Sequence, residues 1–399
     1  MSTPYQKAID LLHQVSTERG YLASANDIAN YRRIWARDGV ICGLAGALDG
    51  DQKLVEAFKN TLITLADHQH ELGNIPSNVH YDGATPSLSF GGLAGRVDTV
   101  SWFIIGVCQY AYLTGDILFF EQNKAKLELG FQLMHSWEYN DGDLMYVPRS
   151  GNWADEYPTQ GFIFYDQVLR LWALRCYLHF EDKARMRTKH DRIQEKLELN
   201  FKKNAKNKQP YHPKAFESLA KLPYWAASLE PAGYQTQFDG FGNALALLLG
   251  LGSAQDQKEL INYAAELAQE LSLQLMPAFW PVITEEDPDW RFLVNNCKYE
   301  FRNFPYEFHN GGTWPMVNGF FGAGLWVHGK EHAAAQVLAK AMTARIHQLN
   351  ALEGWSFYEN FNSESGTPNG VPYCAWSAAG AVLLMQYQKG NQLLTELKS

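Results

Sequence analysis

Two kinds of helical segment alternate along this chain, and this alternation limits the possible folds more than any other feature. Apolar residues recur with a period near 3.6, whereas alternating strand-like runs are rare. One kind of segment is Gly-rich and apolar nearly all round, which predicts burial on most sides. These segments are 39–49, 98–115, 161–180, 240–251, 313–328 and 374–388. The other kind is amphipathic with a charged face: 4–18, 53–69, 118–136, 184–204, 255–273 and 331–349.

Six buried helices alternating with six surface helices predict two concentric rings. Each outer helix would cover a seam of the inner ring, and segment 4–18 would complete the outer ring beside the last inner helix. The fold expected is therefore an all-α (α/α)6 barrel that forms a single catalytic domain over residues 1–399. Hydrophobic residues make up 46% of the chain, which is enough for a large core.

The connectors of this predicted barrel are unequal in length. The long ones are rich in Gly, Pro, Asn and Trp, and each leads into an inner helix; they are 19–38, 70–97, 137–160, 205–239, 274–312 and 350–373. Long connectors in a compact domain are usually functional. Since the inner helices all start at one end, we expect these connectors to form one rim and one site.

Acids, aromatic rings and amides recur at this rim. The candidate residues are Trp35, Arg37, Asp38, Asp98, Trp102, Trp153, Asp155, His309, Asn310, Trp314, Tyr358 and Glu359. Each residue alone has a structural explanation. Asp38, Asp98 and Asp239 could cap helix N-termini, and some of the tryptophans could be core rings. Such explanations do not account for the gathering of all these types at one end.

Glycoside hydrolysis requires a set of residues of this kind. An inverting enzyme needs one carboxyl group that protonates the leaving oxygen and one that activates water, about 6.5–9.5 Å apart. Two acids on different rim loops can meet that spacing. Aromatic residues make up 14% of the chain, and rings beside polar groups suit a sugar.

Several motifs, in the same order along the chain, resemble those of the alkaline/neutral invertases. They are also shared, more distantly, with the glucosidase I/mannosylglycerate hydrolase group and the debranching-type α-glucosidases. The motifs are IWARDGV at 34–40, FGGLAGRVDTVSWF at 90–103, the segment 161–176 with Gln167 and ALRC, HNGGTWP at 309–315, and YENFNSESG at 358–366. The resemblance covers roughly residues 30–390.

This resemblance implies an inverting, exo-acting hydrolase that cleaves an α-glucoside-type bond of a small, sucrose-like sugar. It implies that Asp98 is the general acid and that Glu359 is the general base. Arg37 and Asp38 would hold the sugar at the cleaved bond, and Gln167, in the segment that matches the family's third inner helix, would bind the substrate as well. The chain departs from the invertases at Tyr165, where they carry a Glu, and the leaving group stays open.

Two alternatives remain from the sequence. A sugar 2-epimerase-like isomerase uses a similar barrel but needs histidines for proton transfer, and His309 is the only His in a strong motif. A non-catalytic sugar-binding protein would also have such a rim, but the presence of both carboxylates argues against it.

Charge and cysteine content limit the partners and the location. The net charge is −9 without a basic run, so no nucleic acid is expected. The five scattered cysteines form no CxxC pair, which predicts neither a metal site nor disulfides. We find no signal-like or membrane-spanning stretch and therefore expect a cytoplasmic protein without cofactors. Its partner would be a small carbohydrate, and a homo-oligomer is left open.

Overall fold

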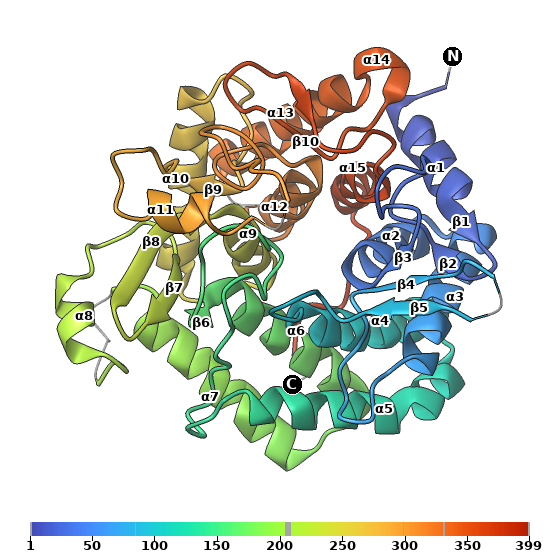
Figure 1. Ribbon diagram of the computed structural model, residues 1–399, viewed down its shortest axis with the longest axis horizontal. Coiled ribbons are helices and arrows are strands. Elements are labelled where there is room, and N and C mark those ends of the chain that lie inside the picture. The colour runs from blue at the N-terminus through green and yellow to red at the C-terminus, as the bar shows by residue number, and fades with distance from the viewer. Residues whose placement is uncertain (1, 84, 204–208, 298, 330–331, 398–399) are drawn as a thin grey trace.

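The computed structural model describes residues 2–83, 85–203, 209–297, 299–329 and 332–397 (Figure 1). Each predicted buried segment is a helix. These are α2 (Ala36–Asp49), α4 (Asp98–Thr114), α6 (Phe164–Phe180), α9 (Gly240–Leu248), α12 (Pro315–His328) and α15 (Ala375–Gln388).

Each predicted amphipathic segment is a helix as well. These are α1 (Pro4–Val15), α3 (Gln52–Asp67), α5 (Ile117–Ser136), α7 (Ala184–Asn200), α10 (Ala254–Glu270) and α13 (Ala333–Asn350). The predicted limits at Asn204 and Glu331 lie outside the described residues.

The buried helices form a closed ring. Helix α2 contacts α4, and the contacts continue through α6, α9, α12 and α15 back to α2 (Figure 1). Each outer helix lies against a member of this ring: α1 on α15, α3 on α2, α5 on α4, α7 on α6, α10 on α9 and α13 on α12. This arrangement is compatible with the predicted (α/α)6 barrel.

Small residues allow the inner helices to pack closely. A Cβ on Gly319 of α12 would lie 2.4 Å from the carbonyl oxygen of Gly380 in α15. That distance is well inside van der Waals contact, so the two backbones touch where both residues are glycine. The Gly-rich composition of the inner segments therefore reflects the tightness of the ring.

The prediction of an all-α chain is incomplete, because the connectors contain short strands. These are β1 (Ser16–Thr17), β2 (Gly20–Tyr21), β3 (Ile34–Trp35), β4 (Asn78–His80), β5 (Ser87–Ser89), β6 (Phe162–Ile163), β7 (Ala226–Glu230), β8 (Gly233–Asp239), β9 (Phe279–Trp280), β10 (Asn360–Phe361) and β11 (Pro368–Asn369). They form antiparallel sheets, the larger two in the orders β3-β4-β5 and β6-β7-β8-β9. Short helices α8 (Pro213–Ser218), α11 (Trp290–Val294) and α14 (Leu352–Trp355) also lie in connectors.

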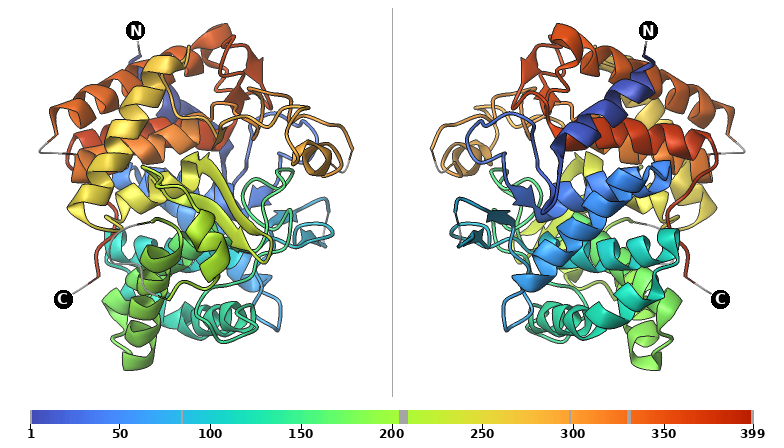
Figure 2. Two further views of the ribbon diagram at one scale, coloured as in Figure 1. Left: turned by 90° about the vertical axis from the view of Figure 1, so that its left-hand side faces the viewer. Right: turned by 90° about the vertical axis from the view of Figure 1, so that its right-hand side faces the viewer.

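The two ends of the ring differ. Strands β4 and β5 and helix α11 project on one side of the molecule, and the C-terminus lies on the opposite side (Figure 2). On that opposite side the chain after α15 enters the ring. The Leu394 carbonyl accepts hydrogen bonds from Gln109 Nε2 at 2.7 Å and Trp172 Nε1 at 2.8 Å. Among the described residues, none of the helices combines the length and apolarity needed to cross a bilayer.

Candidate active site

Buried polar atoms without a hydrogen-bond partner gather where the inner helices begin. Among the described residues, each inner helix has one such group in its first turn or just before it. They are Arg37 Nε, Asp98 Oδ1, both Asp166 carboxylate oxygens, Asp239 Oδ2, Thr313 Oγ1 and Trp376 Nε1. Native proteins pair nearly all buried polar groups, so a cluster of unpaired ones indicates a place that a polar ligand or water fills.

Asp98 is the first residue of α4, and its side chain is only 1% exposed. Its Oδ2 atom accepts a hydrogen bond from Arg37 Nη1 at 2.7 Å and another from the Tyr165 hydroxyl at 3.1 Å. The capping explanation fails here, because Val97 is the N-cap and the Asp98 carboxyl makes no cap bond. It holds for Asp239, whose Oδ1 accepts the backbone N–H groups of α9.

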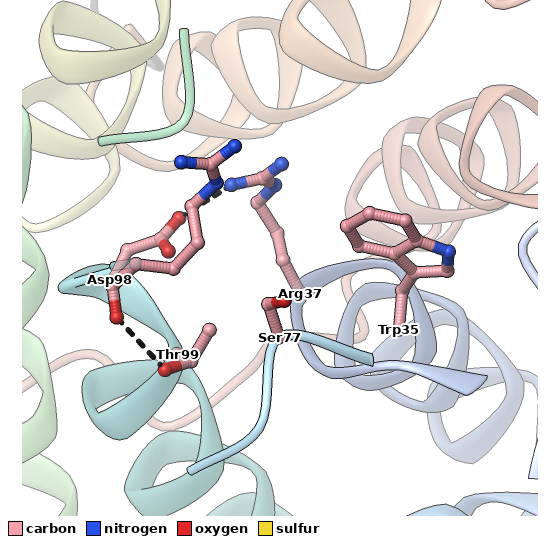
Figure 3. A pocket seen from close by; sticks show the side chains of 6 residues that line it. Trp35, Arg37, Ser77, Asp98 and Thr99 are labelled. Carbon is pink, nitrogen blue, oxygen red and sulfur yellow. Dashed lines mark hydrogen bonds and ion pairs between the residues drawn. The ribbon is translucent and has the colours of Figure 1, made fainter. Parts of the chain in front are cut away.

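A pocket lies beside this carboxyl group (Figure 3). In the close-up, Arg37 extends from the start of α2 toward Asp98, with Trp35 on the other side of Arg37. The lining residues are Trp35, Arg37, Ser77, Arg96, Asp98 and Thr99. The Trp35 indole donates to the backbone carbonyl of Asn30, which holds the ring at the pocket wall.

Glu359 lies in the last long connector and is 3% exposed. Its Oε1 accepts a hydrogen bond from the Tyr31 hydroxyl at 2.6 Å, while Oε2 has no partner among the described residues. Burial raises the pKa of Glu359 to about 7, although the Tyr31 hydrogen bond and the charge of Arg302 oppose this. The carboxyl group is thus poised to gain or lose a proton near neutrality.

Asp38 interacts electrostatically with both proposed catalytic acids. Burial raises its pKa to about 6, the Arg37 guanidinium lowers it, and the charge of Asp98 raises it further. The charge of Asp38 in turn contributes to the raised pKa of Glu359. Asp98 begins α4, and Glu359 lies in the connector that leads into α15, where another inner helix begins. Asp98 and Glu359 therefore belong to the same end of the ring.

Three predicted rim residues form an aromatic cluster. The His309 ring stacks on Trp314 with 5.0 Å between centroids and 3° between planes, and Trp153 meets His309 edge-on at 5.2 Å. Burial lowers the pKa of His309 to about 3, so the imidazole is neutral at physiological pH. The His309 Nδ1 and Trp153 Nε1 atoms have no hydrogen-bond partner among the described residues.

Several predicted sugar-binding residues have their polar groups engaged by the protein. The side-chain amide of Gln167 accepts a hydrogen bond from the backbone N–H of Met145 and donates one to its carbonyl. The side-chain amide of Asn310 bonds the backbone of Ile283 in the same way. The Gln167 amide thus fixes a connector to the ring, and the Asn310 amide joins two parts of one connector. Trp314 donates a hydrogen bond to the carbonyl of Phe308, and Tyr358 donates one to the Glu353 carboxylate. Trp102 donates to the Tyr165 hydroxyl, and Asp155 accepts from Arg96.

Sequence reasoning missed four polar residues of this cluster. Tyr31, Asp166 and Trp376 were not assigned to the site, and Tyr165 was noted only as a departure from the invertases. Asp166 is buried, and neither of its carboxylate oxygens has a hydrogen-bond partner among the described residues. Burial raises the pKa of Asp166, and the charges of Asp98 and Asp239 raise it further. Its position, next to Tyr165 at the start of a buried helix, was the available signal.

Comparison with known proteins finds the same group of enzymes that the sequence motifs resemble. Residues 215–390 match the family of alkaline and neutral invertases. The chain is 24% identical to the mitochondrial alkaline/neutral invertase C of Arabidopsis thaliana, over 92% of this chain and 63% of that protein, so it spans less than two thirds of that relative. It is 21% identical to cytosolic invertase 1 of Oryza sativa subsp. japonica, over 90% of this chain and 71% of that protein. The predicted resemblance to the alkaline and neutral invertases is confirmed.

A solved structure has the same fold as this chain. The mannosylglycerate hydrolase from Thermus thermophilus, in complex with Tris, superposes with a TM-score of 0.69. The comparison covers 96% of this chain and 100% of that one, at 15% identity. The named relatives and this structural neighbour are glycoside hydrolases, as expected from the motifs.

Proposed function

We propose that this chain is an inverting, exo-acting glycoside hydrolase acting on an α-glucoside-type bond of a small sugar, with a single (α/α)6-barrel catalytic domain. The observation that carries the proposal is the gathering of unbonded, buried polar atoms at the starts of all six inner helices. Sugar hydroxyls both donate and accept hydrogen bonds, so a bound sugar ring satisfies donors and acceptors together. The similarity to invertases supports a sucrose-like substrate.

In the proposed reaction, a protonated Asp98 gives its proton to the glycosidic oxygen while the bond from that oxygen to C1 breaks. Glu359 takes a proton from a water molecule, and the water oxygen bonds to C1 from the opposite face. The products are a free sugar of inverted anomeric configuration and an alcohol. Burial around Glu359 excludes competing bulk water and matches its pKa to work near neutrality.

The other candidate residues would either bind the sugar or hold the parts of the site that bind it. Asp38 accepts hydrogen bonds from hydroxyl groups of the sugar, and Trp35, Trp153 and His309 provide ring faces and edges for the sugar's C–H groups. Asn310, Gln167, Trp314 and Trp102 contribute by holding connectors and other site residues, because their polar groups are engaged. The substrate is a small carbohydrate, and the predicted cytoplasmic location is in keeping with five unpaired thiols.

The epimerase alternative is weakened by the state of His309. Proton transfer at neutral pH needs a group whose pKa lies near the working pH, and burial lowers that of His309 to about 3. The two buried carboxyl groups, one with a pKa of about 7, are better suited to acid–base work.

Two amide variants test the proposed function. Asp98→Asn and Glu359→Gln keep the side-chain shape but remove the acid and the base, so each is expected to lower kcat by about 10²- to 10⁴-fold. The assay is reducing-sugar release from sucrose, α-linked glucose disaccharides and glucosyl- or mannosylglycerate. Full activity in either variant contradicts the assignment of that residue.

A further inference from the structure

Two donors bind the same oxygen of Asp98. Arg37 Nη1 and the Tyr165 hydroxyl both contact Oδ2, at 2.7 Å and 3.1 Å. The other oxygen, Oδ1, is buried and has no partner among the described residues. A protonated carboxyl group has one carbonyl oxygen that accepts hydrogen bonds and one hydroxyl oxygen that donates. Since Oδ2 already accepts two, the proton belongs on Oδ1.

Tyr165 is itself held by a tryptophan. The Trp102 indole N–H donates to the Tyr165 hydroxyl oxygen at 2.9 Å, which leaves the phenol proton to point toward Asp98. Trp102 is fully buried, and its ring packs against Phe241 and Trp172 in the ring core. The indole therefore has a fixed position, and the order of donors is Trp102 to Tyr165 to Asp98.

We propose that Tyr165, held by Trp102, is a positioning residue that fixes the rotation of the Asp98 carboxyl group so that Oδ1 presents its proton to the leaving-group oxygen. This inference deepens the proposed function and rests on it. Burial and the charge of Asp98 raise the pKa of Tyr165 far above its ordinary value, so the phenol keeps its proton. Tyr165 is then a neutral donor that does not exchange protons during the reaction.

The two donors on Oδ2 have different roles in this arrangement. Arg37 brings a positive charge, and its side chain also lines the pocket. Tyr165 brings no charge and reaches Asp98 from α6, a helix adjacent to α4 in the ring. Losing the phenol leaves Asp98 with a single donor, around which the carboxyl group can rotate. Proton delivery then becomes less frequent, while sugar binding is unchanged.

The test compares leaving groups that differ in their need for a proton. An alcohol must be protonated as it departs, whereas fluoride leaves as an anion, and water activated by the base still attacks C1. The substrates are sucrose, or the glycoside that the wild type hydrolyses best, and α-glucosyl fluoride. Tyr165→Phe is expected to lower kcat on the glycoside by about 10- to 100-fold with KM unchanged, and kcat on the fluoride by less than about threefold.

Two further variants make the result specific. Trp102→Phe is expected to give the same preference for the fluoride with a smaller loss, because it frees the phenol without removing it. Tyr21→Phe is the matched control: its buried hydroxyl donates to the Leu54 carbonyl at 2.7 Å, far from the site, and both activities should stay at the wild-type level. Asp98→Asn lacks the acid altogether, so it sets the upper limit for the ratio of fluoride activity to glycoside activity.

The outcomes separate the two proposals. Equal losses on both substrates in Tyr165→Phe, or no loss on either, overturn the positioning role while the wild-type activity still supports the hydrolase. A wild type that hydrolyses neither the fluoride nor any of the glycosides overturns the hydrolase and the positioning role together.

Discussion

The two carboxyl groups at the centre of this site have different surroundings. Asp98 contacts a guanidinium and a phenol at a single oxygen, whereas Glu359 accepts a hydrogen bond from a phenol, and the backbone of Val371 and the charge of Arg302 act on it as well. Two acids placed in different environments can take different protonation states at one pH. The proposed acid and the proposed base are therefore held by different donors.

The Tyr31 hydroxyl controls the proposed base. Its hydrogen bond favours the charged form of Glu359 and lowers a pKa that burial raises to about 7. The reaction needs the ionised form, so kcat/KM should fall as the pH drops below about 7. Tyr31→Phe removes the donor, which raises the pKa and moves this acidic limb to higher pH by roughly one unit. The measurement is kcat/KM against pH for both proteins.

An unshifted limb in Tyr31→Phe, or a limb displaced to lower pH, would show that the acidic limb does not report on Glu359. The control is Tyr21→Phe, which loses a buried tyrosine hydroxyl elsewhere and should keep the wild-type profile.

Single residues differ in how far the sequence reveals them. Asp98 and Glu359 stand in recognisable motifs, and both are buried at the ring end where the sequence predicts them. Tyr31 lies 328 positions from Glu359, so only the folded chain brings them together. Gln167 was predicted to contact the sugar, but both polar atoms of its amide bond the Met145 backbone.

Buried charges connect neighbouring helices on the outer side of the ring. Glu138, just after α5, accepts from Arg170 of α6 at 2.7 Å and from Lys189 of α7 at 3.0 Å. Although burial opposes ionisation, these cations hold the pKa of Glu138 at about 2. The network therefore stabilises the fold above the ordinary pKa of a glutamate, and this contribution is lost as the pH falls toward 2.

Arg170→Met should destabilise the fold by about 3 kcal/mol, because it leaves Glu138 buried without its nearest cation. The comparison is Arg187→Met, which breaks a pair with the well-exposed Asp182 and should cost less than about 0.5 kcal/mol. Denaturant unfolding of both variants gives the two free energies. Equal effects would show that burial adds nothing to the Glu138 network.

At the scale of elements, periodicity identifies helices better than strands. All twelve predicted helices are found among the described residues, because each spans enough turns for an apolar face to show. Strands of two or three residues are too short to alternate. The hairpin of β7 and β8 is the exception, since GYQTQF in β8 alternates and the preceding PAG suggests a turn.

At the scale of the whole molecule, the proposed catalytic residues and the C-terminal segment that stabilises the fold lie at opposite ends of the ring. The site lies where the inner helices start, and the C-terminal segment enters the ring at the other end, where Leu393 and Leu394 are buried. The Leu394 carbonyl and N–H both bond the Gln109 side chain of α4. This segment fills the end of the ring opposite the long connectors.

Ending the chain after Gly390 should therefore lower stability without changing the chemistry. Two buried leucines are lost, and the buried Gln109 amide and Trp172 indole lose their bonds to Leu394, which together cost about 4 kcal/mol or more. The kcat of the folded protein should change by less than about twofold. Gln392→Ala alters an exposed residue of the same segment and should behave as wild type. A stable truncated protein with lost activity would contradict this division.

The most direct test of the account is the configuration of the first sugar released. Proton NMR can follow the anomeric signals of an α-glucoside, such as sucrose, before the product mutarotates. The account predicts that β-glucose appears first, because water held by Glu359 attacks opposite the bond that Asp98 protonates. α-Glucose as the first product would mean a covalent intermediate and would contradict the assignment of both residues.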